Sequence, residues 1–287
     1  MCLIYVSSSC SRSTRIGDAV RSLLARDCTH VELSGGSEWY PELEQDLMAL
    51  RAGGLVQLLC HNYFPPPREH FIINLASLDP VIRARSLELL GEAIRLSARL
   101  GAATFGMHAG FLVDLKTEEA GRTVGRRGLF AREAAVAAFW EAYDRLHQVA
   151  QGCGVTLYLE NNVYSSGNYR TYGEDRPFLL TCHAEYVELR RQRGFSLLLD
   201  LAHLKVSCRT LGLDFEKEYA ALAACSDYWH ISENDGLEDT NGALTPDSSI
   251  LATIARHAFR PKIVTIEVRG IDAAVTSAQQ VRQQFQG

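Results

Sequence analysis

The sequence predicts an α/β protein, a single (β/α)8 TIM barrel, on three observations. Short apolar runs alternate along the chain with longer amphipathic segments, which is the pattern of parallel βα units. Eight such units fit into 287 residues at about 36 residues each, the length that a strand, a helix and two loops need. The long connections at 61–79, 109–130 and 161–177 all follow predicted strands, on the side where such barrels build their sites.

The expected strands are short and rich in apolar or β-branched residues, and the expected helices are longer and amphipathic. The strands are predicted at residues 3–6, 30–33, 56–60, 104–107, 156–159, 196–199, 228–231 and 263–266. The helices are predicted at residues 14–26, 41–52, 80–100, 131–151, 178–193, 214–224, 247–257 and 271–285. A doubly wound open sheet shows the same alternation, but it normally carries a glycine-rich nucleotide turn where this chain has Ser7–Ser11. The barrel is therefore favoured.

The third expected helix has clear start and stop signals. Asp79 offers an N-cap, Pro80 suits the first helical position, and Gly101 ends the helix. No linker rich in Pro, Gly and Ser divides the chain, so residues 1–287 are expected to form one domain. Trp140 and Tyr143 lie in another expected helix and are interpreted as core residues.

The composition indicates a soluble globular protein of the cytoplasm. Hydrophobic residues make up 47% and charged residues 22%, with a mean hydropathy of -0.07, which disfavours disorder and membrane classes. No apolar run reaches the roughly 18 residues of a membrane span, and Cys2–Val6 is too short for a signal-peptide core. The eight cysteines form no CxxC pair, so reduced thiols are expected.

The net charge of -5 favours a small-molecule substrate over nucleic acid without ruling nucleic acid out. A local basic patch could still hold phosphate, although the plainer interpretation of its loop arginines is a solvated loop face. The patch consists of Arg122, Arg126, Arg127 and Arg132.

Four potential metal ligands each end an apolar run. They are Glu160, Asp200, His230 and Glu267. Their separations of 40, 30 and 37 residues correspond to about one βα unit each, so a barrel would bring all four side chains to one rim. Three carboxylates and one imidazole suit Mn, Mg, Co or Zn.

The first half of the chain supplies comparable residues at strand ends, namely His61, His108 and Glu32. His203 follows Asp200 at a DxxH spacing. A lone His or Glu at a strand end is more often a satisfied structural residue than a ligand, so these rank below the set of four.

Asn161 and Asn162 directly follow Glu160. Amides at this position either bind substrate hydroxyls or satisfy loop backbone groups, and the residues themselves favour neither.

These residues resemble the xylose isomerase-like barrel superfamily, which includes sugar and sugar-phosphate isomerases and epimerases and also endonuclease IV. The resemblance covers nearly the whole chain. The set of four matches the metal ligands of the isomerases and epimerases, and the segment His230–Gly236, which contains Glu233, resembles the HxSEND segment of ketose 3-epimerases. His203 matches a histidine that contacts substrate in that family. The arginine that follows SEND in those epimerases has no counterpart here, because Gly236 and Leu237 occupy that place.

The middle of the chain resembles the DNA-repair branch of the superfamily more closely. Eight residues match its nine zinc ligands: His61, His108, Glu160, Asp200, His203, His230, Asp239 and Glu267. Asn241 stands where the ninth ligand, a histidine, is expected. An amide is a poor zinc ligand compared with imidazole, which puts a third metal position in doubt.

Two reactions are compatible with these residues. The first is metal-dependent isomerisation or epimerisation of a sugar, sugar phosphate or related polyhydroxy carbonyl compound, with proton transfer by Glu160 and Glu267 through a metal-stabilised enediolate. A hydride shift would use the same residues. The alternative is zinc-dependent phosphodiester hydrolysis at abasic DNA, as in endonuclease IV. A barrel that has lost catalysis ranks last.

For the first reaction, the resemblance implies a divalent metal cofactor, a third catalytic candidate in His203 and a further metal role for His61, His108, His203 and Asp239. Substrate contacts are expected from His61, His108, Asn162 and Glu233. Homo-oligomers are common in the family. The residues do not specify which sugar is the substrate, which metal is bound or how many ions there are.

Overall fold

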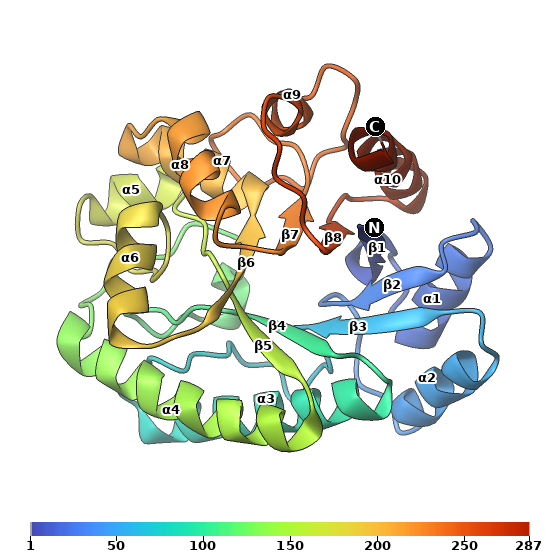
Figure 1. Cartoon of the computed structure of the whole chain (residues 1–287). Helices are drawn as coiled ribbons and strands as arrows, with labels where there is room; N and C mark the ends of the chain where they lie inside the picture. Colours follow the sequence, from blue (N-terminus) through green and yellow to red (C-terminus); the bar gives the residue numbers. More distant parts are fainter. Residues whose placement is uncertain (1, 287) are drawn as a thin grey trace.

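The computed structural model describes residues 2–286, in which eight parallel strands close into a barrel in chain order. Figure 1 shows the ring of strands with the helices around it. The strands are β1 (Leu3–Ser7), β2 (His30–Leu33), β3 (Gln57–His61), β4 (Thr104–His108), β5 (Thr156–Glu160), β6 (Ser196–Asp200), β7 (Tyr228–Ile231) and β8 (Ile263–Ile266). The predicted (β/α)8 barrel is confirmed, and β8 pairs with β1 to close it.

The strand register already places the candidate ligands next to one another. His108 at the end of β4 lies opposite Glu160 at the end of β5. Asp200 at the end of β6 lies opposite His230 in β7. Since all strands run parallel, their carboxyl ends share one rim of the barrel.

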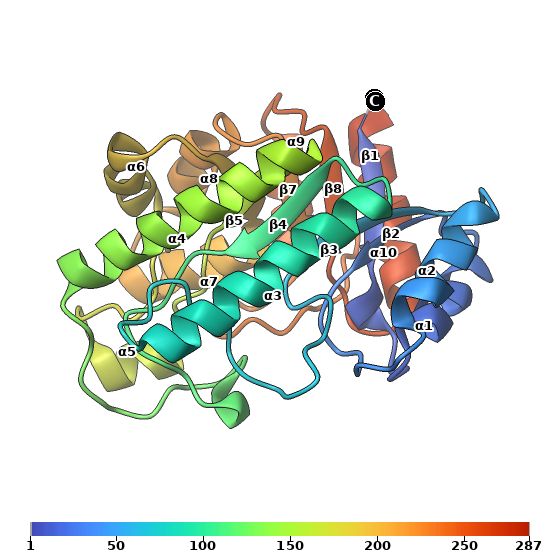
Figure 2. The same cartoon turned by 90° about the horizontal axis from the view of Figure 1, so that it is seen from below.

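The helices cover the outside of the barrel. They are α1 (Ile16–Leu24), α2 (Leu43–Ala52), α3 (Pro80–Arg99), α4 (Arg132–Cys153), α5 (Ser166–Tyr172), α6 (His183–Gln192), α7 (Leu201–Leu211), α8 (Phe215–Ala223), α9 (Ser249–Ala255) and α10 (Ile271–Gln286). Figure 2 shows α3 and α4 side by side along the outside of the barrel. None of the helices in residues 2–286 combines the length and apolar character that crossing a membrane requires.

Helix α3 begins and ends where the sequence indicates. The Asp79 carboxylate accepts a hydrogen bond from the Val81 N–H at 2.7 Å, and Pro80 opens the helix. Gly101 follows the helix with a φ of 75°, a left-handed conformation that glycine adopts without strain. Local capping signals therefore set this helix.

Two helices and one boundary differ from the prediction. Helix α5 lies in the expected connection 161–177, and α7 follows β6 at once because the Asp200 carboxylate accepts the His203 N–H at 2.6 Å and caps the helix. The predicted helix 178–193 begins only at His183. Residue Phe178 instead pairs with Phe111 in an antiparallel bridge, which keeps the chain extended there.

The core lies between the helices and the barrel, with a second cluster inside the barrel. Trp140 and Tyr143 are buried against it, as predicted. All eight cysteines are free. The interior cluster fills the barrel beneath the carboxyl-end rim and contains Tyr5, Leu59, Ala102, Tyr158, Leu198 and Tyr228.

Candidate metal centre

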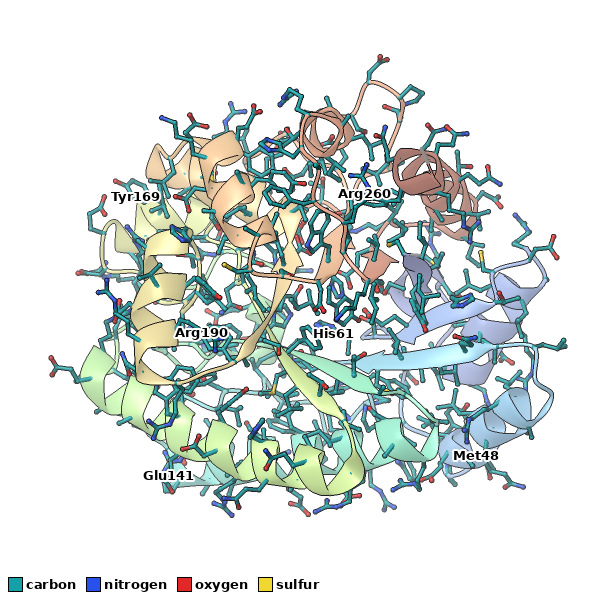
Figure 3. The ribbon with its side chains drawn as sticks, in the orientation of Figure 1. Met48, His61, Glu141, Tyr169, Arg190 and Arg260 are labelled. Atoms are coloured by element: carbon teal, nitrogen blue, oxygen red, sulfur yellow. The ribbon has the colours of Figure 1, made fainter. Side chains whose placement is uncertain are left out.

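The barrel brings the four predicted ligands together. Each offers one ligand atom, and these atoms all lie within 4.8 Å of one another. They come from the ends of four consecutive strands, as the sequence spacing predicts: Glu160 from β5, Asp200 from β6, His230 from β7, and Glu267 directly after β8. Figure 3 shows His61, from β3, toward the middle of the same ring of strands.

Glu160 is the centre of this cluster. Its carboxylate is fully buried and contacts three imidazoles. Glu160 Oε2 lies 2.8 Å from His61 Nε2 and 3.0 Å from His108 Nδ1. Glu160 Oε1 lies 3.3 Å from His230 Nδ1. His61 and His108, which are expected as further ligands or substrate contacts, therefore lie beside the set of four.

The backbone of β4 makes room for His61. A Cβ atom at Gly106 would come within 2.6 Å of His61 Cδ2 and 2.7 Å of Leu198 Cδ1. Such distances are well inside van der Waals contact, so a side chain at this position would displace the imidazole. The glycine keeps His61 within reach of Glu160.

The donor set fits a cation between the carboxylates. His230 Nδ1 lies 3.3 Å from Glu160 and 3.5 Å from Glu267, yet it makes no hydrogen bond of good geometry. Glu160 Oε1, which faces this nitrogen, is likewise buried without a hydrogen-bond partner. Buried polar atoms that lack partners and converge on one point are typical of an ion site.

The electrostatics of the ligands also fit a cation. Burial favours the neutral form of Glu160, but His108 and His61 outweigh it and hold the pKa of this carboxyl well below its usual range. Burial raises the pKa of Asp200 to about 7 against the opposing charge of His203, and the neighbouring Glu160 carboxylate adds to the rise. A divalent ion would remove this penalty on carboxylates that share one buried site.

His203 connects the primary ligands to Asp239. His203 Nδ1 lies 2.8 Å from the Asn161 carbonyl oxygen, which can only accept, so this nitrogen carries the proton. His203 Nε2 faces the Asp239 carboxylate at 3.4 Å. His108, Glu160 and His203 form a second compact group of potential ligands. The structure thus places His61, His108 and His203 beside Glu160, and Asp239 beside His203.

The amides after Glu160 serve the backbone. Asn161 exchanges two hydrogen bonds with the main chain of Asp200, at 2.8 and 2.9 Å. The Asn162 amide donates to the carbonyl oxygens of Ala109 and Leu179, although Asn162 also lines the cavity over the site. The backbone alternative that the sequence left open is realised for both residues.

Glu233 lies away from the cavity. Its carboxylate contacts Lys205 Nζ at 2.5 Å and the start of α9 through the Ile250 N–H. The role of Glu233 in binding substrate stays a prediction without a contact that supports it. Asn241 lines the cavity, and its amide nitrogen can donate to both Asp239 carboxylate oxygens at 3.3 Å.

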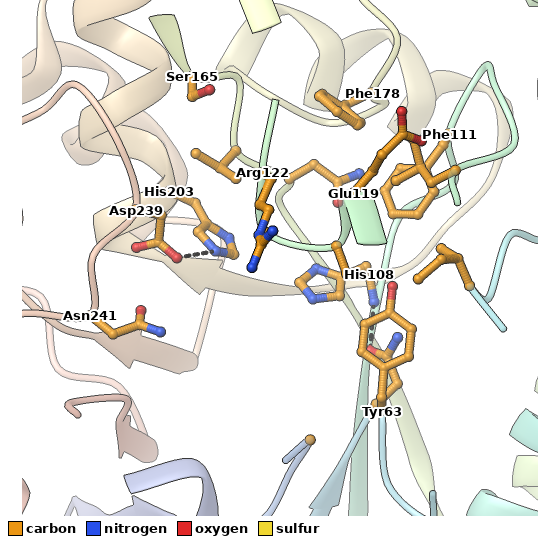
Figure 4. A pocket seen from close by; sticks show the side chains of 18 of the residues that line it. Tyr63, His108, Phe111, Glu119, Arg122, Ser165, Phe178, His203, Asp239 and Asn241 are labelled. Atoms are coloured by element: carbon orange, nitrogen blue, oxygen red, sulfur yellow. Dashed lines mark hydrogen bonds and ion pairs between the residues drawn. The ribbon is translucent and has the colours of Figure 1, made fainter. Parts of the chain in front are cut away.

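A cavity of about 310 Å³ opens above the ligands. His61, His108, His203, Asp239 and Glu267 line its floor. The connection after β4 and the segment around α5 also line the cavity, with Phe111 and Phe178 facing each other (Figure 4). These segments pack into a separate apolar cluster: Phe111, Val113, Val124, Tyr164, Tyr172 and Phe178. This volume lies at the lower end of the range of about 300–1,000 Å³ that small-molecule sites occupy.

Two residues that the sequence analysis ranked below the set of four also belong to the site. Glu32, in β2, lies under His230 with its Oε1 at 3.0 Å from His230 Nε2. Arg122 is exposed, as expected for a loop face, and also lines the cavity. The sequence indicated Glu32 by its place in a predicted strand, and Arg122 as one member of a basic patch that could hold phosphate or form a solvated loop face.

Comparison with known proteins identifies the family. The sequence matches the xylose isomerase-like TIM barrel family over residues 26–283. The chain belongs to this family. The predicted family membership is thereby confirmed. A separate comparison with curated protein sequences finds no significant match.

Several solved structures share the fold of this chain. A D-tagatose 3-epimerase-like protein has a TM-score of 0.74 and 16% identity over 99% of this chain and 97% of its own. A D-allulose 3-epimerase from Methylomonas sp. has a TM-score of 0.69 and 16% identity over 99% and 98%. A protein from Thermus thermophilus, soaked with zinc chloride, has a TM-score of 0.60 and 20% identity over 99% and 98%.

Proposed function

We propose that this member of the xylose isomerase-like family is a divalent-metal-dependent isomerase or epimerase of a sugar, a sugar phosphate or a related polyhydroxy carbonyl compound. The observation that carries the proposal is the convergence of Glu160, Asp200, His230 and Glu267 beneath a cavity of small-molecule size. The D-allulose 3-epimerase and the D-tagatose 3-epimerase-like protein, whose structures share the fold, support the same class of reaction.

The four convergent residues would hold the ion. When bound, a divalent metal polarises a substrate carbonyl and its neighbouring hydroxyl and makes the adjacent carbon-bound proton more acidic. Asp200 and His230 orient the other ligands, because Asp200 also caps α7 and His230 lies between two carboxylates.

Glu160 and Glu267 are the proposed proton carriers. The Glu267 side chain is 13% exposed and lines the cavity, so it can take a proton directly from a substrate carbon. Glu160 is fully buried, and His61 and His108 stabilise its ionised form. His203, the third catalytic candidate, lines the cavity with Nε2 toward Asp239 and can bind or protonate a substrate oxygen.

Exchange of substrate protons with solvent tests the proposal. Metal-loaded protein incubated with ketoses and their phosphates in D2O is expected to incorporate deuterium at the carbon next to the carbonyl. Glu267→Gln and Glu160→Gln should each lower the rate by at least about 10²-fold, the contribution of a positioned acid or base. Conversion without deuterium uptake would instead indicate a hydride shift between carbons.

A second candidate function has one specific observation in its favour. The group formed by His108, Glu160 and His203 supports binding of more than one metal ion, which phosphodiester hydrolysis at abasic DNA requires. Asn241, in the place of the expected ninth zinc ligand, faces Asp239 with an amide and weakens this candidate. Cleavage of an abasic-site duplex by pure protein, abolished in Glu160→Gln, would favour it over the isomerase.

A further inference from the structure

The arginines of the loop after β4 differ in how their charge is balanced. Arg127 pairs with Glu119 at 2.5 Å, Arg132 with Glu188 at 3.0 Å, and Arg126 reaches Asp175 at 4.0 Å. Within residues 2–286, no carboxylate lies within 4 Å of the Arg122 guanidinium, although Arg122 lines the cavity over the metal centre. This side chain is therefore a cation without a carboxylate partner among the described residues, at the cavity over the candidate metal centre.

The backbone on both sides of Arg122 is held in place. The Arg122 N–H donates to the Glu119 carbonyl oxygen at 3.0 Å. The Glu119 carboxylate accepts the N–H groups of Lys116 and Gly125 at 2.9 and 3.0 Å. The Val124 N–H donates to the buried Asn168 side chain at 2.8 Å. A side chain carried on a fixed segment binds a ligand at a lower entropic cost.

The acidic residues of the cavity already have partners or lie apart. Glu119 is committed to Arg127 and to two backbone amides, and these hold the pKa of its carboxyl below the usual value although burial opposes this. Asp239 faces His203, and within the described residues neither Asp239 nor Glu238 comes within 4 Å of the Arg122 guanidinium. Figure 4 shows the Arg122 side chain pointing into the cavity, toward the region of His203 and His108.

We propose that Arg122 binds an anionic group of the substrate, a phosphate or a carboxylate, while the polyhydroxy carbonyl end lies at Glu160 and Glu267. This inference rests on the proposed isomerase function. A substrate that fills the cavity removes water from the guanidinium, and a neutral sugar would offer this charge only hydroxyl groups. Phosphate and carboxylate match its planar fork with two parallel hydrogen bonds.

Calorimetric titration of the metal-loaded full chain tests the proposal. The ligands are D-fructose, D-tagatose and D-psicose with their 6-phosphates, and D-glucose with D-glucuronate, so that the phosphate and carboxylate arms are separate. At least one anion is expected to bind about tenfold or more tightly than its neutral counterpart. Arg122→Gln should remove that preference and leave neutral sugars within twofold, and Arg122→Lys should retain part of it.

Arg126→Gln is the matched control, because Arg126 lies on the same loop but pairs outside the cavity with Asp175. It should leave anion binding unchanged. The proposal is overturned if no anion binds better than a neutral sugar or if Arg122→Gln keeps the preference. Activity assays separate the two proposals. Arg122-dependent anion binding without deuterium exchange or conversion of any sugar rejects only the isomerase function. Deuterium exchange of the phosphorylated ketoses at the wild-type rate and affinity in Arg122→Gln rejects only the role of Arg122.

Discussion

Glu32 Oε1 lies 3.0 Å from His230 Nε2 inside the barrel, on the opposite edge of the imidazole from Glu160 and Glu267. The Glu32 carboxylate also accepts the hydroxyl groups of Tyr228 and Thr265. A carboxylate at this edge favours the tautomer with its proton on Nε2 and leaves the Nδ1 lone pair for a metal ion.

Glu32→Gln is expected to weaken metal binding about 10- to 100-fold, the usual cost of losing a partner behind a ligating histidine. The amide can donate to Nε2 and so move the proton to Nδ1, where it competes with the ion. Calorimetric titration with Mn²⁺ measures the change. Glu185→Gln is the control, because Glu185 is a buried carboxylate that bonds Thr181 away from the cavity. Equal affinities in wild type and Glu32→Gln would contradict the prediction.

Metal content distinguishes the two candidate reactions. Protein loaded with metal and dialysed is expected to retain about one equivalent of Mn, Co or Mg in the set of four ligands, and Glu160→Gln should retain much less. Elemental analysis by mass spectrometry measures both. Retention of about three zinc ions per chain would contradict the single-ion site and favour the phosphodiesterase.

Metal affinity is expected to fall as the pH decreases below about 7. Burial raises the pKa of Asp200 to about 7, so the metal-free site holds a proton there at lower pH. Burial opposes the charged form of His230, but Glu32 and Glu267 keep its pKa well above the usual value. Each proton must leave before the ion binds, so binding releases protons and strengthens as the pH rises. Calorimetric titration at several pH values, in buffers of different ionisation enthalpy, measures the metal affinity and the number of protons released. A metal affinity that stays constant between about pH 6 and about pH 7.5 would contradict this coupling.

Gly106→Ala is expected to disturb the site through His61. The added methyl group would clash with the imidazole and with Leu198, at a cost of about 1–3 kcal/mol in the free energy of unfolding. The displaced imidazole leaves Glu160, so metal affinity should fall as well. Denaturant unfolding and metal titration measure the two effects.

Gly152→Ala is the control for this substitution, since the space around Gly152 in α4 is open. It should keep metal affinity and leave stability unchanged or slightly higher. If Gly106→Ala keeps both the stability and the metal affinity, as this control should, the position of His61 does not depend on the glycine.

Much of the fold and of the ligand set could be predicted from local signals. The apolar runs of β5, β6 and β8 each lead to a carboxylate, and regular spacing in a closed parallel barrel places these carboxylates on one rim. Helix α7 was missed because its start depends on Asp200, whose side chain caps the helix as well as facing the metal centre. The sequence indicated the role of Asp200 at the strand end, and that one signal did not also reveal its role as a helix cap.

The sequence by itself determined the barrel, the four convergent candidate ligands and the family, because strand periodicity and the spacing of these residues are local properties of the chain. Only the tertiary structure decided that Glu32 lies behind His230 and that Arg122 lines the cavity without a carboxylate partner among the described residues. Both relationships join residues far apart in the chain, and neither follows from periodicity or a motif. They depend on which side chains the closed barrel and the packed loop after β4 leave facing each other.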